Sequence, residues 1–399
     1  MSDNRAYRWK ILIASYLASF AFGMTLQNVP PVMPLLIEDF GLAHAEAGLT
    51  MSLFALPMIF LSIPAGLLAD RLGPKRVGLL AFVCTIVGSL VVAFSTSFPM
   101  LLAGRAIAGA GALTLVLIAP QFISQWFMAR ELGTAMGIWN TAFPLATIVS
   151  FVSLGGIGQA LGWRASMLVA LLAVIICMGV FWLLASPAPA TGQRAERRGS
   201  LPQTIGRAGV TIWLVGAAWL LFNASTLSFM AFAQDYFQSA GYPVVMAGLL
   251  SSMMLWGTFV AAPLVGVLLD RGLRNELLMI IGSLGLAAAL FLVPASPSLV
   301  VPILLFGALV SSLIVVSIFA LPSTLLEPRL LGLGYGILAT CLNVGTTLGP
   351  FLVGAVRDAS GSYTPGFWAM SIMALLISVA ALALFATRST IPKARSVPE

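Results

Sequence analysis

Charged side chains are scarce in this chain of 399 residues: they make up 8% of it, against 60% hydrophobic residues and a mean hydropathy of +1.03. A soluble domain usually carries about 25% charged residues. The shortage of charge excludes a soluble globular protein. It predicts an all-α integral membrane protein in the lipid bilayer, because apolar segments in lipid must satisfy their backbone groups within helices.

Histidine and cysteine are also scarce, with one His and three Cys. Cys84, Cys177 and Cys341 all fall in apolar stretches, and an odd, scattered set argues against a disulfide framework or a metal site. The sequence lacks a cluster of nucleophile and base, metal ligands or a phosphate-binding loop, so it predicts no enzyme, no cofactor and no metal. The net charge of +7 is spread over many short loops and does not indicate a nucleic-acid partner.

Long apolar runs, separated by charge, Pro or Gly clusters, predict twelve transmembrane helices. Their predicted ranges are 10–36, 46–69, 76–96, 99–126, 132–159, 164–185, 208–233, 244–269, 276–294, 298–322, 332–356 and 365–386. The longest polar segment, 186–207, is rich in Pro, Gly and Arg. It predicts a cytoplasmic linker between an N-terminal six-helix half, residues 1–185, and a C-terminal six-helix half, residues 208–399.

Basic residues are distributed unequally between the two sides of the predicted spans. An even number of spans places both termini on one side, and 17 of the 20 Lys and Arg residues fall there, all except Arg105, Arg164 and Arg357. Cytoplasmic loops carry an excess of Lys and Arg. The asymmetry predicts cytoplasmic termini, and the lack of targeting signals indicates a bacterial inner membrane. We expect a monomer.

The two halves share short motifs at a constant offset. Residues 66–71 read GLLADR and residues 266–271 read GVLLDR, 200 positions later. RELG at 130–133 and RLLG at 329–332 repeat with an offset of 199. The chain is therefore predicted to contain two copies of one membrane unit, and two halves that rock about a shared centre are typical of secondary transporters.

Two motifs of the first half identify a family. Residues 66–76 read GLLADRLGPKR, and residues 105–111 read RAIAGAG. The chain resembles the major facilitator superfamily, whose signatures are G-x-L-a-D-r-x-G-r-k after the second helix and R-x-x-x-G-x-G in the fourth. The resemblance implies twelve helices in two pseudo-symmetric halves and secondary transport by alternating access.

Within that family, the motifs leave two kinds of substrate open. Residues 28–36, NVPPVMPLL, are similar to anion and nutrient porters of the cyanate and nitrate type. The G-P-x-x-G-G motif of drug/proton antiporters does not match the fifth span, which reads TAFPLAT at 141–147. We therefore expect transport of a small polar or anionic solute. Export of lipophilic compounds is the alternative, and an abundance of Met and Phe would suit its cavity.

Charged residues and glycines at the predicted cytoplasmic ends suggest a conformational latch. An aspartate there can accept hydrogen bonds from the N-terminus of a neighbouring helix, and a glycine lets that helix approach. Such a cluster would form only when the cytoplasmic side is shut; ordinary positive-inside anchoring is the alternative. The predicted latch residues are Gly66, Asp70, Arg71, Gly73, Arg76, Arg130, Asp270, Arg271 and Arg329.

Polar residues within the spans are the candidates for contact with the solute. Arg105 is the only basic residue well inside a span, and it either binds an anion or donates to backbone carbonyls of a neighbouring helix. The amides either bind solute or join helices. The predicted solute-binding residues are Gln27, Asn28, Arg105, Gln121, Trp139, Asn140, Trp219, Asn223 and Asn343.

Carboxylates are missing from the centres of the predicted spans, although they are common proton carriers in pumps. Five acidic residues fall near the predicted outer ends of the spans: Glu38, Asp39, Glu46, Asp235 and Asp358. His44 falls in the first outer loop, where we expect it to be solvated. If protons drive transport, the proton travels with the solute; a uniporter or an exchanger also fits.

Overall fold

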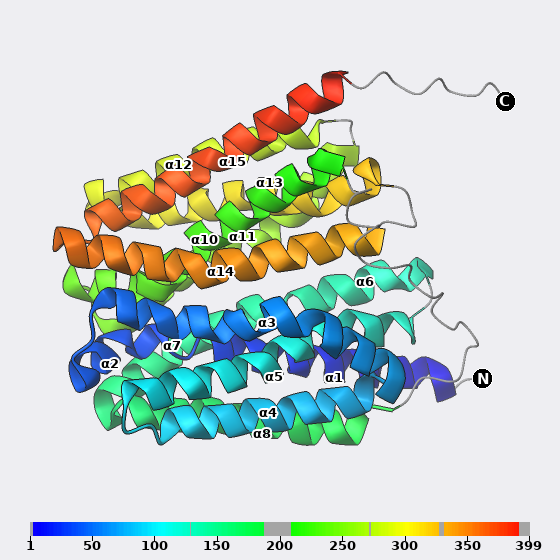
Figure 1. Ribbon diagram of the computed structural model, residues 1–399, viewed down its shortest axis with the longest axis horizontal. Helices are drawn as coiled ribbons and strands as arrows, with labels where there is room; N and C mark the ends of the chain where they lie inside the picture. The colour runs from blue at the N-terminus through cyan, green and yellow to red at the C-terminus, as the bar shows by residue number, and fades with distance from the viewer. Residues whose placement is uncertain (1–2, 128, 187–208, 271–272, 327–330, 391–399) are drawn as a thin grey trace. The chain divides into compact units, whose positions relative to one another are not determined.

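Each predicted span is mainly α-helical in the structure, a computed structural model that describes residues 3–127, 129–186, 209–270, 273–326 and 331–390 (Figure 1). No β-strand occurs in these ranges. The elements of the first half are α1 (Asp3–Leu26), η1 (Pro30–Val32), α2 (Met33–Phe40), α3 (His44–Leu72), α4 (Pro74–Ala93), α5 (Phe98–Ser124), α6 (Ala129–Asn140), α7 (Ala142–Leu161) and α8 (Trp163–Leu184). Those of the second half are α10 (Gly209–Ser239), α11 (Val244–Asp270), α12 (Asn275–Ala295), η2 (Pro297–Leu299), α13 (Val300–Leu325), α14 (Leu331–Ser360) and α15 (Thr364–Thr390).

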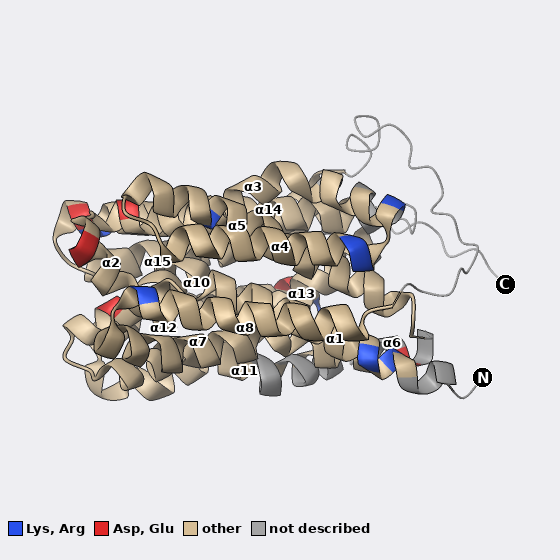
Figure 2. Ribbon diagram, turned by 90° about the horizontal axis from the view of Figure 1, so that it is seen from below, with Lys and Arg blue, Asp and Glu red and all other residues tan. Residues whose placement is uncertain are grey.

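The lengths and apolar surfaces of these helices fit a membrane. Among the described residues, 11 helical segments are long and apolar enough to cross it, and α11 supplies a shorter apolar segment, Val244–Gly257. Charged residues of α1 to α8 lie mainly near the helix ends, with Arg105 on α5 as an exception (Figure 2). The chain is a multi-pass helical membrane protein, which confirms the prediction from composition.

Contacts divide the chain into two units. Unit 1 comprises Met1–Arg194, Leu227–Leu255 and Thr346–Gly366, and unit 2 comprises Ala195–Thr226, Trp256–Gly345 and Phe367–Glu399. Unit 1 therefore joins the predicted N-terminal half to segments of α10, α11 and α14. The predicted linker lies outside the described residues from position 187 onward, and the boundary between the halves stays a prediction.

Backbone contacts at glycine hold the helices of unit 1 together. Helices α4 and α8 flank α1 and α5, with α3 packed on α5 and α7 on α1 (Figure 1). A Cβ added at Gly109 on α5 would lie 1.9 Å from the Phe54 carbonyl oxygen on α3. One added at Gly88 on α4 would lie 2.1 Å from the backbone nitrogen of Ala108. The glycines of these apolar segments thus act as close helix contacts.

The first predicted span, 10–36, is not one continuous helix. Helix α1 ends at Leu26, and three residues of turn precede η1 and α2. Pro30 and Pro31 cause the break, because proline has no N–H to donate to the carbonyl four residues earlier and its ring clashes with that carbonyl. The Leu26 carbonyl therefore lacks its helical donor, and two predicted site residues, Gln27 and Asn28, lie in the turn.

The fifth predicted span, 132–159, also divides. Helix α6 ends at Asn140 and α7 begins at Ala142, with Thr141 between them. Pro144 is the cause, since it cannot donate to the carbonyl of Asn140. The Thr141 hydroxyl donates to the Ile138 carbonyl at 2.7 Å, which satisfies a backbone group at the end of α6.

Candidate functional site

Arg105 forms the centre of a buried hydrogen-bond cluster in unit 1, with 1% of its surface exposed. A guanidinium has five N–H donors, and each donor here has an acceptor. The acceptors are the carbonyl oxygens of Thr25 (2.7 Å), Leu26 (3.2 Å) and Thr50 (2.9 Å), Asn28 Oδ1 (3.2 Å) and Met51 Sδ (3.6 Å). The guanidinium carbon also lies 4.5 Å from the centroid of the Phe54 ring.

The break in α1 explains this arrangement. The carbonyls of the last helical turn lack helical donors, and a cation is favoured at a helix C-terminus. Arg105 therefore caps α1 and ties it to α3 and α5. Because all five donors are used within the protein, the geometry favours the structural alternative for Arg105 over direct contact with solute. Its bond to Oδ1 also fixes the orientation of the Asn28 amide.

Gln27 lies beside this cluster and is fully buried. Its backbone carbonyl accepts from the Ser150 hydroxyl of α7 at 2.7 Å, and its Nε2 donates to Met230 Sδ of α10 at 3.2 Å. Its Oε1 has no hydrogen-bond partner among the described residues. Gln27 thus joins three helices and keeps one acceptor unsatisfied.

Gln234 is a buried amide that the sequence analysis missed. It lies one turn beyond Met230 on α10 and has no exposed surface. Neither its Nε2 nor its Oε1 has a partner among the described residues. A Cβ added at Gly155 of α7 would lie 2.4 Å from this Nε2. The seventh span was predicted to end at residue 233, whereas α10 continues to Ser239, and that boundary hid the residue.

The other predicted site residues of unit 1 are less enclosed. Gln121 is half-buried on α5, and Trp139 is half-buried on α6, where its Nε1 donates to the Ser19 hydroxyl of α1. Asn140 is exposed at the end of α6. Trp139 and Asn140 therefore lie on a different helix from the residues that Arg105 contacts.

Trp219, Asn223 and Asn343 lie in unit 2 and are buried. Asn223 Nδ2 donates to the Trp219 carbonyl at 2.8 Å, and Asn343 Nδ2 donates to the Ala339 carbonyl at 3.0 Å. The Oδ1 of Asn343 has no described partner. The indole of Trp219 stacks on Phe222, with centroids 5.4 Å apart and planes 7° from parallel.

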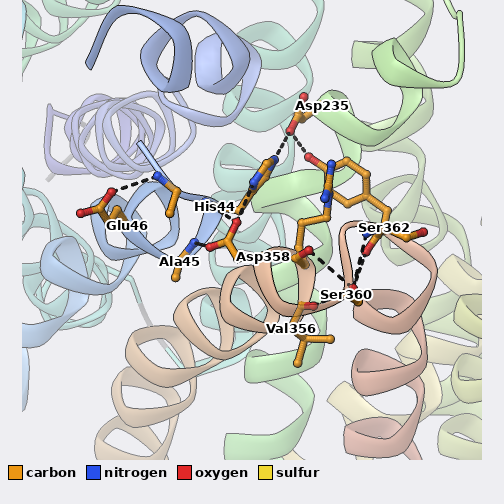
Figure 3. Close-up of polar contacts among 11 residues, drawn as sticks. His44, Ala45, Glu46, Asp235, Val356, Asp358, Ser360 and Ser362 are labelled. Atoms are coloured by element: carbon orange, nitrogen blue, oxygen red, sulfur yellow. Dashed lines mark hydrogen bonds and ion pairs between the residues drawn. The ribbon is translucent and has the colours of Figure 1, made fainter. Parts of the chain in front are cut away.

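A second polar cluster of unit 1 surrounds His44, at the helix ends predicted to face outward (Figure 3). The expectation of a solvated loop residue is wrong: His44 is the first residue of α3, and its side chain is 19% exposed. Its Nδ1 lies 2.9 Å from Asp358 Oδ1 on α14, and its Nε2 lies 3.5 Å from Asp235 Oδ2 on α10. The imidazole thus bridges carboxylates of two helices of the C-terminal half.

Asp358 also caps α3. Its two oxygens accept the backbone N–H groups of His44 at 2.8 Å and of Ala45 at 2.7 Å (Figure 3). A carboxylate at a helix N-terminus satisfies orphan donors and suits the helix dipole. Asp235 in turn accepts the hydroxyl of Tyr363, which follows α14. The guanidinium of Arg357 lies 4.7 Å from the centroid of that tyrosine ring.

Glycines bring the same helix ends into close contact. A Cβ at Gly48 of α3 would lie 2.5 Å from the Pro350 carbonyl oxygen of α14, and one at Gly354 of α14 would lie 2.4 Å from the His44 carbonyl oxygen. A Cβ at Gly248 of α11 would lie 2.1 Å from the carbonyl oxygen of Phe151 on α7. We call these glycine contacts and the His44, Asp235 and Asp358 cluster the outer gate, after the predicted orientation; its helix ends are in contact within unit 1.

The predicted latch is only partly within the described structure. Gly73 joins α3 to α4 with a φ of 83°, a conformation that favours glycine. Arg71 and Arg76 are exposed, and a Cβ added at Gly66 would meet no described atom within 4 Å. The remaining latch residues lie, wholly or in their side chains, outside the described part: Asp70, Arg130, Asp270, Arg271 and Arg329. The latch stays a prediction.

Known proteins resemble the whole chain. The family model described as Major Facilitator Superfamily matches residues 15–243 and 214–399. The "Probable sulfoacetate transporter" of Cupriavidus necator is 26% identical over 388 residues, which cover 89% of this chain and 88% of that protein. The "Chloramphenicol resistance protein" of Streptomyces lividans is 26% identical over 391 residues, with 94% and 95% covered.

A solved structure has the same fold. It is a bacterial homologue of the human lysosomal transporter Spinster, in an inward-facing and occupied conformation. The TM-score is 0.79 at 19% sequence identity, and the match covers 98% of this chain and 99% of that one. This likeness supports the arrangement of helices and carries nothing about the solute.

Proposed function

This chain belongs to the major facilitator superfamily, and we propose that it moves a small polar or anionic solute across the membrane by alternating access. It is a membrane transporter rather than an enzyme. We further propose a bacterial inner membrane as its location, cytoplasmic termini and a monomeric state. Proton coupling, uniport and exchange are all compatible with this proposal.

The buried, unsatisfied amides are the observation that carries the proposed solute class. In unit 1, Gln27 Oε1 and both amide atoms of Gln234 lack described partners. A buried polar group without a hydrogen bond costs about 1–3 kcal/mol. A polar solute would satisfy such groups, whereas a lipophilic compound would leave them unsatisfied.

Arg105 then acts on the solute through another residue. Its donors are all engaged, so it holds Asn28 in place rather than binding the solute itself. An anion would be bound by the amide N–H groups of Gln234, whose Nε2 has no described partner. In unit 1 the proposed site comprises Gln27, Asn28 and Gln234. The other predicted solute-binding residues stay predictions: Gln121, Trp139, Asn140, Trp219, Asn223 and Asn343.

Export of lipophilic compounds is the second candidate. The match to the chloramphenicol resistance protein favours it, because the identity of 26% equals that to the sulfoacetate transporter and the coverage is larger. Sequence similarity therefore does not distinguish transport of a polar or anionic solute from export of lipophilic compounds. A ligand-binding measurement is needed to distinguish them.

A thermal-shift screen of the purified protein tests the proposal. Sulfoacetate, small carboxylates and nitrate would be compared with chloramphenicol and lipophilic cations. A ligand at about 100 times its Kd stabilises the folded state by roughly 2.7 kcal/mol. Stabilisation by a small polar or anionic compound, reduced in Gln234→Met and kept in the exposed control Gln125→Met, supports the proposal. Stabilisation by lipophilic compounds alone would overturn it.

A cytoplasmic latch completes the proposed cycle. We expect Asp70 to hold the cytoplasmic side shut when the outer gate is open. Asp70→Asn should then shift the population toward the inward-open state, as measured by distances between spin labels. An unchanged balance of states, with unchanged transport, would refute the latch.

A further inference from the structure

His44 faces two carboxylates with its two ring nitrogens (Figure 3). A carboxylate can only accept a hydrogen bond, and a neutral imidazole carries one N–H and one lone pair. A neutral His44 can therefore donate to Asp358 or to Asp235, and its other nitrogen then meets an oxygen lone pair. Only the doubly protonated imidazolium donates to both.

We propose that His44 is a proton-binding site that controls the outer gate. The imidazolium joins α3 to α10 through Asp235 and to α14 through Asp358, and it holds the gate closed. Loss of the proton removes one of these attractions and favours opening. Acidic medium on the outer side thus shifts the transporter toward the state with a closed outer gate.

The charges around His44 agree with this assignment. Asp235 on α10 accepts the Tyr363 hydroxyl and so is held as an acceptor. Arg357 on α14 lies over the Tyr363 ring and is the other cation of the cluster. Glu46 on α3 is engaged by the backbone N–H of Ala43 at 2.9 Å. Protonation of His44 therefore balances two carboxylates with two cations, and its loss leaves the cluster with a net negative charge.

The expected effect of protonation on the gate depends on how far the three side chains are exposed to water. The side chains of His44, Asp235 and Asp358 are 19%, 14% and 29% exposed, so water screens the two pairs in part. The cap that Asp358 provides to the α3 N-terminus does not depend on the imidazole charge. We expect the ratio of closed to open gates to change by about three- to tenfold on protonation.

Distances between spin labels on the outer ends of α3 and α14 test the proposal. Exposed Ala43 and Ala359 would be replaced by cysteine in a background with Cys84, Cys177 and Cys341 changed to alanine. The full-length protein in lipid nanodiscs would be measured from about pH 5.5 to about 8.5, which spans the titration of histidine. The short-distance population should grow as the pH falls, and His44→Gln should remove this dependence.

Matched variants distinguish the effect of His44 from that of the other charged residues at the same helix ends. Glu46→Gln removes a carboxylate at the same helix end that does not contact His44, and it should keep the pH dependence. Asp235→Asn should weaken it, which serves as a second test if His44→Gln folds poorly. A wild-type ratio that is flat with pH, or a dependence that persists in His44→Gln, would overturn the proposal.

The proposal rests on alternating access but not on the identity of the solute. Gly48→Leu, which wedges the gate at Pro350, provides the distinction. If this variant opens the gate while the wild type ignores pH, the His44 assignment alone fails. If no variant ever opens the gate, the proposed alternating access fails with it.

Discussion

Replacement of Arg105 by glutamine should destabilise the protein strongly. The glutamine amide has two N–H donors and can serve at most two of the five acceptors that Arg105 now satisfies. Three buried acceptors would lose their donor, at about 1–3 kcal/mol each, so the loss is on the order of 3–9 kcal/mol. The Leu26 carbonyl depends most on the arginine donor, because Pro30 has no backbone N–H to donate to it.

Thermal unfolding in detergent measures this loss. Arg164→Gln is the matched control, since Arg164 is 46% exposed and pairs with an exposed Asp39, and its loss should cost at most about 1 kcal/mol. The loss of stability in Arg105→Lys should lie between those of Arg105→Gln and Arg164→Gln, because lysine has three N–H donors in place of five. If Arg105→Gln melts like the wild type and loses only its stabilisation by an anion, Arg105 is a ligand of the solute and not a structural donor.

Three further substitutions follow from close contacts and buried amides. Gly109→Ala should lower stability by about 1–3 kcal/mol, whereas Gly179→Ala, which meets nothing within 4 Å, should be neutral or slightly stabilising in thermal unfolding. Gly248→Leu should push the outer gate open and increase thiol labelling of cysteines introduced at Ala43 and Ala359. Unchanged labelling would argue against a role for the contact between Gly248 and Phe151 in the gate. Gln234→Met should raise the melting temperature without ligand, and a lower value would show that its amide has a partner.

The number and places of the spans could be predicted because composition and length decide them. Each predicted range lies mainly on helix, and Gly73, within the motif at 66–76, has a positive φ. The breaks at 27–29 and at Thr141 were missed, since a run of apolar residues hides them. Their causes, Pro30 and Pro144, were visible in the sequence, but a proline in a span causes either a bend or a break.

The partners of the site residues could not be predicted, because they depend on distant packing. Arg105 was placed inside a span from the sequence, but its acceptors are mostly backbone carbonyls 55 to 80 residues away, which no side-chain pattern reports. His44 meets Asp358 across 314 positions, so its loop-like neighbourhood suggested solvent. Gln234 was not recognised as a site residue because the predicted seventh span ended at residue 233, six residues before the end of α10.

Reversible locking of the outer gate tests alternating access most directly. Ala43→Cys and Ala359→Cys, in the background without native cysteines, would be joined by a bis-methanethiosulfonate reagent in proteoliposomes. Uptake of the solute identified by the ligand screen would be measured before locking, after it, and after reduction. Under alternating access, uptake should stop on locking and return on reduction, while single-cysteine controls should be unaffected. Uptake that continues through a locked gate would contradict it.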